Sequence, residues 1–272
     1  MTDSIRVMKG LLIDLDGTMY HGIHPIPDAD RLIACLQQVK LPYRFVTNNS
    51  SATPAAVAER LCGMGIPATA DDVCTSAQAA AEHIATQRRG AAVFAIGEEG
   101  LKTALAEAGL SLVEDHPDVV VQGIDRKLTY ERISAAASFI RGGADYILTN
   151  PDDLVPSTDG FIPGAGSISA MLAAASGTKP HIIGKPSPVL MDYALRKLGA
   201  DASATWVIGD NMATDIAAGV AAGCGTILVL TGITNGENYE SYAEKAGCSP
   251  DMICQNMNEL IAIISERLQP TS

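Results

Sequence analysis

The sequence predicts an α/β protein with a doubly wound parallel sheet and a second α/β domain inserted into it. The first observation is a short apolar run, Leu11–Leu15, that contains Asp14 and is followed by Asp16 and Gly17. Such a run is typical of a strand buried on both faces of a parallel sheet. The second is an alternation of strand and helix patterns, which favours parallel βαβ units with right-handed crossovers. The third is that this alternation starts a second cycle in the middle of the chain.

The first cycle follows directly from the opening strand. Apolar residues at helical spacing, with Pro27 and Asp28 as a start signal, predict the next helix, and Thr53 with Pro54 predicts an N-cap and a first helical residue. The expected elements after the opening strand are a helix over 28–40, a strand over 43–46, a helix from 53 and a strand over 73–76.

A second strand–helix cycle, and then further elements of the first domain, complete the chain. The second cycle has strands over 92–96, 119–122 and 146–149, and helices over 100–108, 130–141 and 164–175. The closing part has a strand from 181, a helix over 188–198, a strand over 205–210, a helix over 214–222, a strand over 226–230 and a strand–helix pair over 252–268. We therefore expect a core domain at 1–78 and 181–272 around an insert at 79–180, with hinges near Ser76–Ala79 and Thr178–His181.

Composition excludes several classes of function. The 272 residues are 47% hydrophobic and 18% charged, and their net charge is −12. A strongly acidic chain lacks the basic surface that sequence-independent nucleic-acid binding requires. No apolar run is long enough to span a membrane and the first residues do not resemble a signal peptide, so we expect a cytoplasmic protein. The six cysteines form no CxxC pair, which indicates reduced thiols and not a zinc site or a disulfide framework.

Asp14 and Asp16 lie at the carboxyl end of the first strand, where open α/β sheets bind ligands. Neighbouring carboxylates are tolerated with a cation or a shared proton, and oxygen ligands favour Mg²⁺. A polar turn is the alternative for this motif taken alone. A calcium loop is excluded, because Met19 and Pro25 stand where that loop needs Gly and Glu.

Three further loops stand at predicted strand ends. Thr47, Asn48 and Asn49 offer a hydroxyl, amides and the start of a helix, which suit a phosphate or an ordinary N-cap. Lys185 is a cation on a stiff loop or a solvated surface lysine. Asp210–Asp215 places two acids across a strand-to-helix turn, as metal ligands or as helix-capping acids.

Taken together, these motifs resemble those of the haloacid dehalogenase-like superfamily of phosphohydrolases. Its four motifs match Asp14–Thr18, Thr47, Lys185 and Asp210–Asp215. The position of the insert and the segments TNNSS, TNPD, PGAGS and GKPSP resemble subfamily IIA, which includes NagD-type nucleotidases and p-nitrophenyl phosphatases. The resemblance implies a Rossmann-like core with an α/β cap of type 2A.

The resemblance also implies roles for individual residues. Asp14 would be the nucleophile that forms an aspartyl-phosphate, and Asp16 the acid that protonates the leaving oxygen and later the base that activates water. Mg²⁺ would be held by Asp14, the backbone carbonyl of Asp16 and Asp210, with Asp215 orienting these ligands. The residues that would hold the phosphoryl group are Thr47 and Lys185, with Gly17, Asn48 and Asn49 as further substrate contacts.

The expected activity is hydrolysis of small phosphate monoesters such as nucleoside monophosphates, sugar phosphates or p-nitrophenyl phosphate. An alkoxide leaving group needs an acid and a halide does not, so Asp16 favours ester cleavage over dehalogenation. The alternatives are a phosphoryl transferase or mutase with the same nucleophile, and a phosphometabolite-binding protein without turnover. The resemblance also implies a homodimer. The motifs define a phosphate monoester but not its organic group.

The insert is the expected source of specificity, but its residues carry weaker signals. Asn150, Asp152 and Asp153 are candidates to face the substrate, although a polar turn explains them as well. Arg126 and Lys127 are candidates for a local positive patch. The glycines of the insert lack the GxGxxG pattern, which argues against dinucleotide binding.

Overall fold

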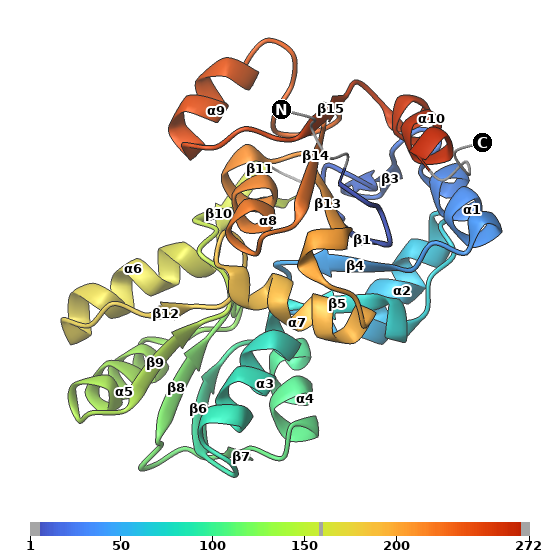
Figure 1. The fold of residues 1–272 in the computed structure, drawn as a ribbon. Helices are drawn as coiled ribbons and strands as arrows, with labels where there is room; N and C mark the ends of the chain where they lie inside the picture. The colour runs from blue at the N-terminus through green and yellow to red at the C-terminus, as the bar shows by residue number, and fades with distance from the viewer. Residues whose placement is uncertain (1–5, 158–159, 268–272) are drawn as a thin grey trace. The chain divides into compact units, whose positions relative to one another are not determined.

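The chain forms two compact units in the computed structural model, which describes residues 6–157 and 160–267. The core unit combines the first 47 residues with 58–74 and with the chain from 185 onward, and the cap unit combines 48–57 with 75–184. Each unit contains its own parallel sheet with helices, which confirms the predicted α/β class (Figure 1). The domain limits expected at 78/79 and 180/181 stay predictions.

The core unit is built on a six-stranded sheet with the order β15-β14-β13-β1-β4-β5. Strand β1 pairs in parallel with β13 on one side and with β4 on the other. Later strands continue outward in both directions, so the strand order reverses between β1 and β13. Open sheets bind ligands at such a point. The strands are β1 (Gly10–Ile13), β4 (Tyr43–Thr47), β5 (Val73–Thr75), β13 (Thr205–Gly209), β14 (Gly225–Val229) and β15 (Met252–Cys254).

Helices of the core unit pack against this sheet and against one another. Helix α1 contacts α10, while α7 contacts α8, β1 and β4. Helix α7 begins after the N-cap Ser187 with Pro188 in its first turn, and it ends at Gly199 in the left-handed region. The helices that include core residues are α1 (Ala29–Val39), α2 (Pro54–Gly63), α7 (Pro188–Leu198), α8 (Ala217–Ala221), α9 (Tyr239–Ala246) and α10 (Met257–Arg267).

The cap unit contains a five-stranded parallel sheet with the order β12-β9-β8-β6-β7. Helices α3 and α4 pack together, as do α5 and α6. The sheet strands are β6 (Ala92–Ile96), β7 (Ser111–Leu112), β8 (Val119–Gln122), β9 (Asp145–Leu148) and β12 (His181–Ile182). The other elements are α3 (Ser76–Gln87), α4 (Glu99–Glu107), α5 (Tyr130–Arg141), α6 (Ala165–Ser176) and the hairpin β10 (Leu154–Ser157) and β11 (Gly160–Pro163).

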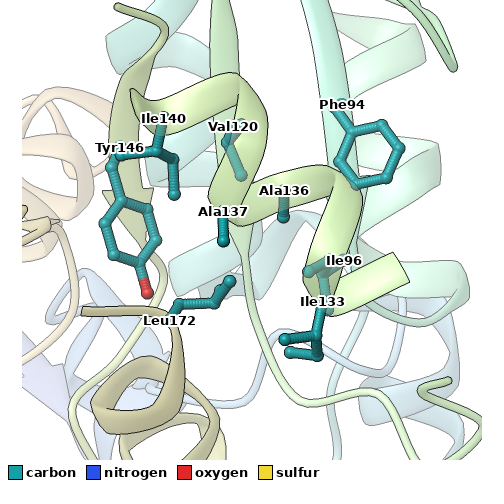
Figure 2. Packing of buried hydrophobic residues seen from close by; sticks show 9 residues of the cluster. All are labelled: Phe94, Ile96, Val120, Ile133, Ala136, Ala137, Ile140, Tyr146 and Leu172. Atoms are coloured by element: carbon teal, nitrogen blue, oxygen red, sulfur yellow. The ribbon is translucent and has the colours of Figure 1, made fainter. Parts of the chain in front are cut away.

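Figure 2 shows how one face of the cap sheet is filled. Ala136 and Ala137 bring helix α5 close to the sheet, where Phe94 and Val120 are buried beneath it. Leu172 reaches the same cluster from α6 and is 0% exposed. The small residues of α5 thus allow the close approach that lets large side chains of two strands and a second helix interdigitate.

Several elements differ from the sequence-based expectation. The predicted strand over 73–76 ends at Thr75, because Thr75 and Gln78 form a capping box that starts the unanticipated helix α3 at Ser76. Helix α9 and the hairpin β2–β3 (Tyr20–His21 and His24–Pro25) were also not anticipated. Within the described residues, no helix combines the length and the apolar character needed to cross a membrane.

Candidate active site

Four charged side chains of the core unit meet where the strand order reverses. Asp14 directly follows β1, and Asp210 directly follows β13. Asp215 lies in the one-turn π-helix Met212–Ile216, and Lys185 precedes α7. All four are buried, with exposed fractions between 1% and 9%. Charged groups are rarely buried to this extent unless they are paired, so the cluster is a candidate site.

Lys185 holds this cluster together through three contacts. Its Nζ donates hydrogen bonds to Asp14 Oδ1 and, at 2.6 Å, to Asp215 Oδ1. It also donates to the backbone carbonyl oxygen of Val46 at 3.2 Å. The ammonium group therefore links the ends of β1 and β4 to the turn after β13. This is a buried, hydrogen-bonded arrangement, unlike the solvated surface lysine that was the alternative.

Crowding and burial shift the pKa values of these groups. Burial raises the pKa of Asp14 well above its usual value, and the nearby charge of Asp215 raises it further, while Lys185 opposes both effects. Burial and Asp215 also raise the pKa of Asp210 to about 6. Burial favours the neutral form of Lys185, but the charges of Asp14 and Asp215 outweigh burial, so the pKa of Lys185 is raised.

Asp210 is fixed by Thr18, which lies in the first motif, and by Ile233, which was not among the predicted site residues. Thr18 Oγ1 donates to Asp210 Oδ1 at 3.1 Å, and the backbone N–H of Ile233 donates to Oδ2 at 2.7 Å. Gly17 has a φ of 87°, and a Cβ at that position would overlap the Asp210 carboxylate. Ile233 follows a Thr-Gly pair after β14, and no feature of its side chain marks its backbone N–H as a donor to Asp210.

Asp215 uses both carboxylate oxygens within the protein. Oδ1 accepts from Lys185, and Oδ2 accepts the backbone N–H of Asn211 at 3.1 Å. Asn211 itself caps the following turn, because its side chain accepts from the N–H of Ala213 at 2.9 Å. This geometry suits a residue that orients its neighbours.

The donor set fits a divalent cation. One carboxylate oxygen from each of Asp14, Asp210 and Asp215 can be chosen so that the three lie within 4.8 Å of one another. Three carboxylates beside one ammonium leave two negative charges uncompensated in a buried site, and a divalent ion would compensate them. Oxygen ligands of this kind are those that Mg²⁺ prefers.

Asp16 lies at the edge of the site, and its side chain is largely exposed. The surrounding protein still desolvates the carboxyl group, which raises its pKa, and the positive charge of Arg60 and the proximity of His21 lower it in part. Arg60 lies over the ring of Tyr20, 4.6 Å from its centroid. An exposed carboxyl group with a raised pKa can exchange protons with a substrate, which the buried acids cannot do as readily.

The predicted phosphate loop is divided between the two units. Thr47 is the last residue of β4 and is buried in the core unit, whereas Asn48 and Asn49 belong to the cap unit. Asn49 Oδ1 accepts from the N–H of Ser51 at 2.8 Å and from its hydroxyl, which is the N-cap-like role weighed as the alternative. Asn48 Nδ2 donates to Asp152 Oδ2 at 3.2 Å.

The carbonyl oxygen of Asn48 accepts two hydrogen bonds from buried side chains of the cap unit. Ser76 Oγ donates to it at 2.6 Å, and Asn150 Nδ2 donates to it at 2.9 Å. Ser76 is 0% exposed, and Asn150 is 5% exposed. The side chains of Asn150 and Asp152, which were candidates to face a substrate, are thus engaged with the segment that follows Thr47.

Within the expected positive patch of Arg126 and Lys127, the Arg126 side chain is paired with an acid. Arg126 Nη1 lies 2.8 Å from Glu98 Oε2, and its backbone N–H donates to Glu98 Oε1 at 3.1 Å. The backbone N–H of Lys127 donates to Asp125. Asp153 is exposed, and its backbone carbonyl accepts the hydroxyl of Ser167 at 2.7 Å. The Arg126 side chain is thus paired with Glu98, while the contacts of Lys127 and Asp153 are made by backbone atoms, and the specificity roles of these residues stay predictions.

Comparison with known proteins shows the family to which the chain is similar. Residues 11–111 match the family described as haloacid dehalogenase-like hydrolase, and residues 182–260 match a second hydrolase family of the same kind. The 5′-nucleotidase YutF of Bacillus subtilis is 46% identical over 89% of this chain and 94% of its own length. An acid sugar phosphatase of Staphylococcus epidermidis is 46% identical over 86% of this chain and 90% of its own.

Solved structures give the same result. A p-nitrophenyl phosphatase from Archaeoglobus fulgidus has a TM-score of 0.89 at 37% identity, covering 94% of this chain and 99% of that one. A glycerol phosphate phosphatase from Mycobacterium tuberculosis, solved in complex with magnesium, has a TM-score of 0.86 at 39% identity, covering 93% of this chain and 77% of that one. These similarities, together with the α/β fold, place the chain among the hydrolases.

The chain belongs to the haloacid dehalogenase-like hydrolases, in the NagD-like subfamily IIA. This confirms the family predicted from the motifs around Asp14, Thr47, Lys185 and Asp210.

Proposed function

We propose that this enzyme hydrolyses small phosphate monoesters with the help of Mg²⁺, through an aspartyl-phosphate formed on Asp14. The enzyme is a phosphomonoesterase of the haloacid dehalogenase type. The observation that carries the proposed mechanism is the position of Lys185, which donates to Asp14 and Asp215 in one buried cluster. Such a group keeps a carboxylate anionic beside an incoming phosphate dianion.

Asp14 is the proposed nucleophile, and its carboxylate attacks phosphorus while the ester bond breaks. Asp16 donates a proton to the leaving oxygen and then removes one from the water that hydrolyses the acyl phosphate. Lys185 and Thr47 hold the phosphoryl oxygens, with Gly17, Asn48 and Asn49 as further proposed contacts. Their charges and dipoles are in place before the reaction, so little reorganisation is needed.

Asp14, Asp210 and the backbone carbonyl of Asp16 would hold Mg²⁺, with Asp215 orienting them. When bound, the ion supplies positive charge that stabilises the phosphoryl oxygens. A cation in this position also explains why burial of three carboxylates is tolerated.

The proposed substrates are nucleoside monophosphates, sugar phosphates and p-nitrophenyl phosphate-like esters. Relatives named 5′-nucleotidase, acid sugar phosphatase and p-nitrophenyl phosphatase support this range. A small phosphorylated metabolite in the cytoplasm is the substrate that we propose.

Release of inorganic phosphate from a panel of these esters, with and without Mg²⁺, tests the proposal. We expect Mg²⁺-dependent release that falls by about 10³-fold or more in Asp14→Asn, since loss of a nucleophile leaves only binding and electrostatic catalysis. Asp30→Asn, an exposed acid of α1, is the matched control and should retain full activity. Release that survives Asp14→Asn in the folded, purified protein would rule out the covalent route.

A further inference from the structure

A second pocket lies within the cap unit, at the amino ends of three of its parallel strands. It has a volume of about 370 Å³. Its lining includes His83 of helix α3, Arg88 directly after that helix, Lys179 and His181. The carboxyl end of β12 leads to Lys185 of the core unit, so this pocket lies at the end of the cap sheet opposite to that connection.

The floor of the pocket is apolar. Ile84 and Val119 are each 2% exposed, and Ile147 is 6% exposed. The polar and charged side chains stand around this floor. An apolar floor with a few convergent polar groups is the usual construction of a small-molecule site, and the volume is at the lower end of the range for such sites.

Two histidines from different elements stack at the edge of this pocket. The ring centroids of His83 and His181 lie 4.9 Å apart, and the ring planes differ by 15°. Burial lowers the pKa of His83, and the charge of His181 lowers it further, so His83 is neutral near pH 7. His181 is exposed, so its ring offers a flat surface beside the pocket.

Lys179 brings an ammonium group to the lining of the pocket, on a chain whose net charge is −12. The one acid in the lining, Asp145, lies 3.3 Å from Arg88, which also lies 3.8 Å from Asp118. In the described part of the chain, no acidic group lies within salt-bridge distance of Lys179. The pocket therefore offers an unpaired ammonium group next to an imidazole pair and an apolar floor.

We propose that this pocket is a second ligand site, which binds a small organic anion whose carboxylate or phosphoryl-type group is carried on a planar ring. The ring lies against the apolar floor and the imidazole pair, and the anionic group faces Lys179. This assignment uses neither the acids of the candidate active site nor the hydrolysis of a phosphate ester, so it is tested independently of the proposed function.

The five histidines provide reporters for the test. His83 and His181 report on the pocket, His21 and His24 on the core unit, and His116 on another part of the cap unit. The imidazole NMR signals of the full-length protein are followed during titration with benzoate and, separately, with the non-hydrolysable phenylphosphonate. We expect saturable shifts of the His83 and His181 signals with at least one of the two anions, and the arm that binds more tightly identifies the anionic group.

Matched ligands and variants decide the outcome. Benzyl alcohol, which has the ring without the charge, and sodium chloride at equal ionic strength should leave the His83 and His181 signals in place. Lys179→Gln should weaken binding about fivefold, the effect of one exposed ion pair, and Lys127→Gln, an exposed lysine outside the pocket, should not. The proposal is overturned if neither anion shifts these two signals, if chloride shifts them equally, or if Lys179→Gln binds as tightly as the parent protein.

Discussion

Lys185 is the cation on which the electrostatics of the candidate site depend. Among the described residues it alone lies within salt-bridge distance of Asp14 and Asp215. A buried ion pair adds little net stability, but removal of one partner leaves the other charge buried without compensation. The residue therefore connects the proposed catalysis with stability, and both can be measured on the same variant.

Lys185→Met should lower the free energy of unfolding of the metal-free protein by about 3–5 kcal/mol, because Asp14 and Asp215 lose their countercharge. Saturating Mg²⁺ should restore part of this loss. Chemical denaturation with and without Mg²⁺ measures both effects. Lys102→Met, an exposed lysine, serves as the control and should change stability by no more than about 0.5 kcal/mol. Equal stability of the two variants would contradict the role given to Lys185.

Asp210 predicts a pH dependence of stability. Its pKa in the folded chain is about 6, above the ordinary value of 3.8, so the folded state binds a proton that the unfolded state has released between these pH values. The contribution of Asp210 to the free energy of unfolding of the metal-free protein therefore falls as pH rises from about 4 to 6. Asp210→Asn removes this contribution, so the variant should gain stability relative to the parent protein as pH rises through that range.

Denaturation curves of the two metal-free proteins at a series of pH values test this prediction. In saturating Mg²⁺ above pH 6, the parent protein should be more stable than Asp210→Asn, because the ion stabilises the ionised carboxylate. A difference in stability that does not change with pH would show that Asp210 does not titrate in this range.

For single residues, the sequence predicted the candidate site where the chemistry requires a particular side chain. Asp14, Lys185, Asp210 and Asp215 were expected at strand ends, and the structure places them in one cluster. The hydrogen bond from Ile233 to Asp210 could not be expected, because a backbone N–H can come from any residue. Only tertiary structure determines which one approaches.

Among the elements, the segment that follows β4 is held by buried side chains of the cap unit. Thr47 ends a core strand, and the next residue has its carbonyl oxygen held by donors from α3 and from the end of β9. Two buried donors on one acceptor fix the backbone at the point where the chain passes from one unit to the other. Helix α3 was not anticipated because its alanine-rich sequence has weak amphipathic patterning, and its start depends on the capping box at Thr75.

The double variant Ser76→Ala with Asn150→Ala should lose more stability than the sum of the two single variants. Each single variant leaves one donor for the Asn48 carbonyl and should lose about 1 kcal/mol. The double variant removes both donors from a buried acceptor. A double-mutant cycle from denaturation curves measures the difference. Ser134→Ala, a serine of α5 that donates to a backbone carbonyl on the surface, is the control. Strict additivity would show that the two donors act independently.

For the whole molecule, the division into two units predicts that a core mutation acts locally. Leu172 is 0% exposed within the cap cluster. Leu172→Ala should lower the stability of the cap unit by about 2–5 kcal/mol through the cavity it leaves. Hydrogen exchange resolved by residue should show faster exchange across 75–184 and little change in β1 and β13. Uniformly faster exchange in both sheets would show that the units unfold together.

The core unit is discontinuous in sequence, which determines the order in which its strands are synthesised. Most of the cap unit is one continuous stretch, 75–184, whereas the core unit needs strands from both ends of the chain. During synthesis, β1 leaves the ribosome well before its partner β13 exists, so one edge of β1 stays unpaired while the cap segment is translated. Because Lys185 and Asp210 follow the cap in sequence, the nascent chain passes through a stage in which the cap unit can be folded and the buried cluster of Lys185 with its carboxylates is still absent.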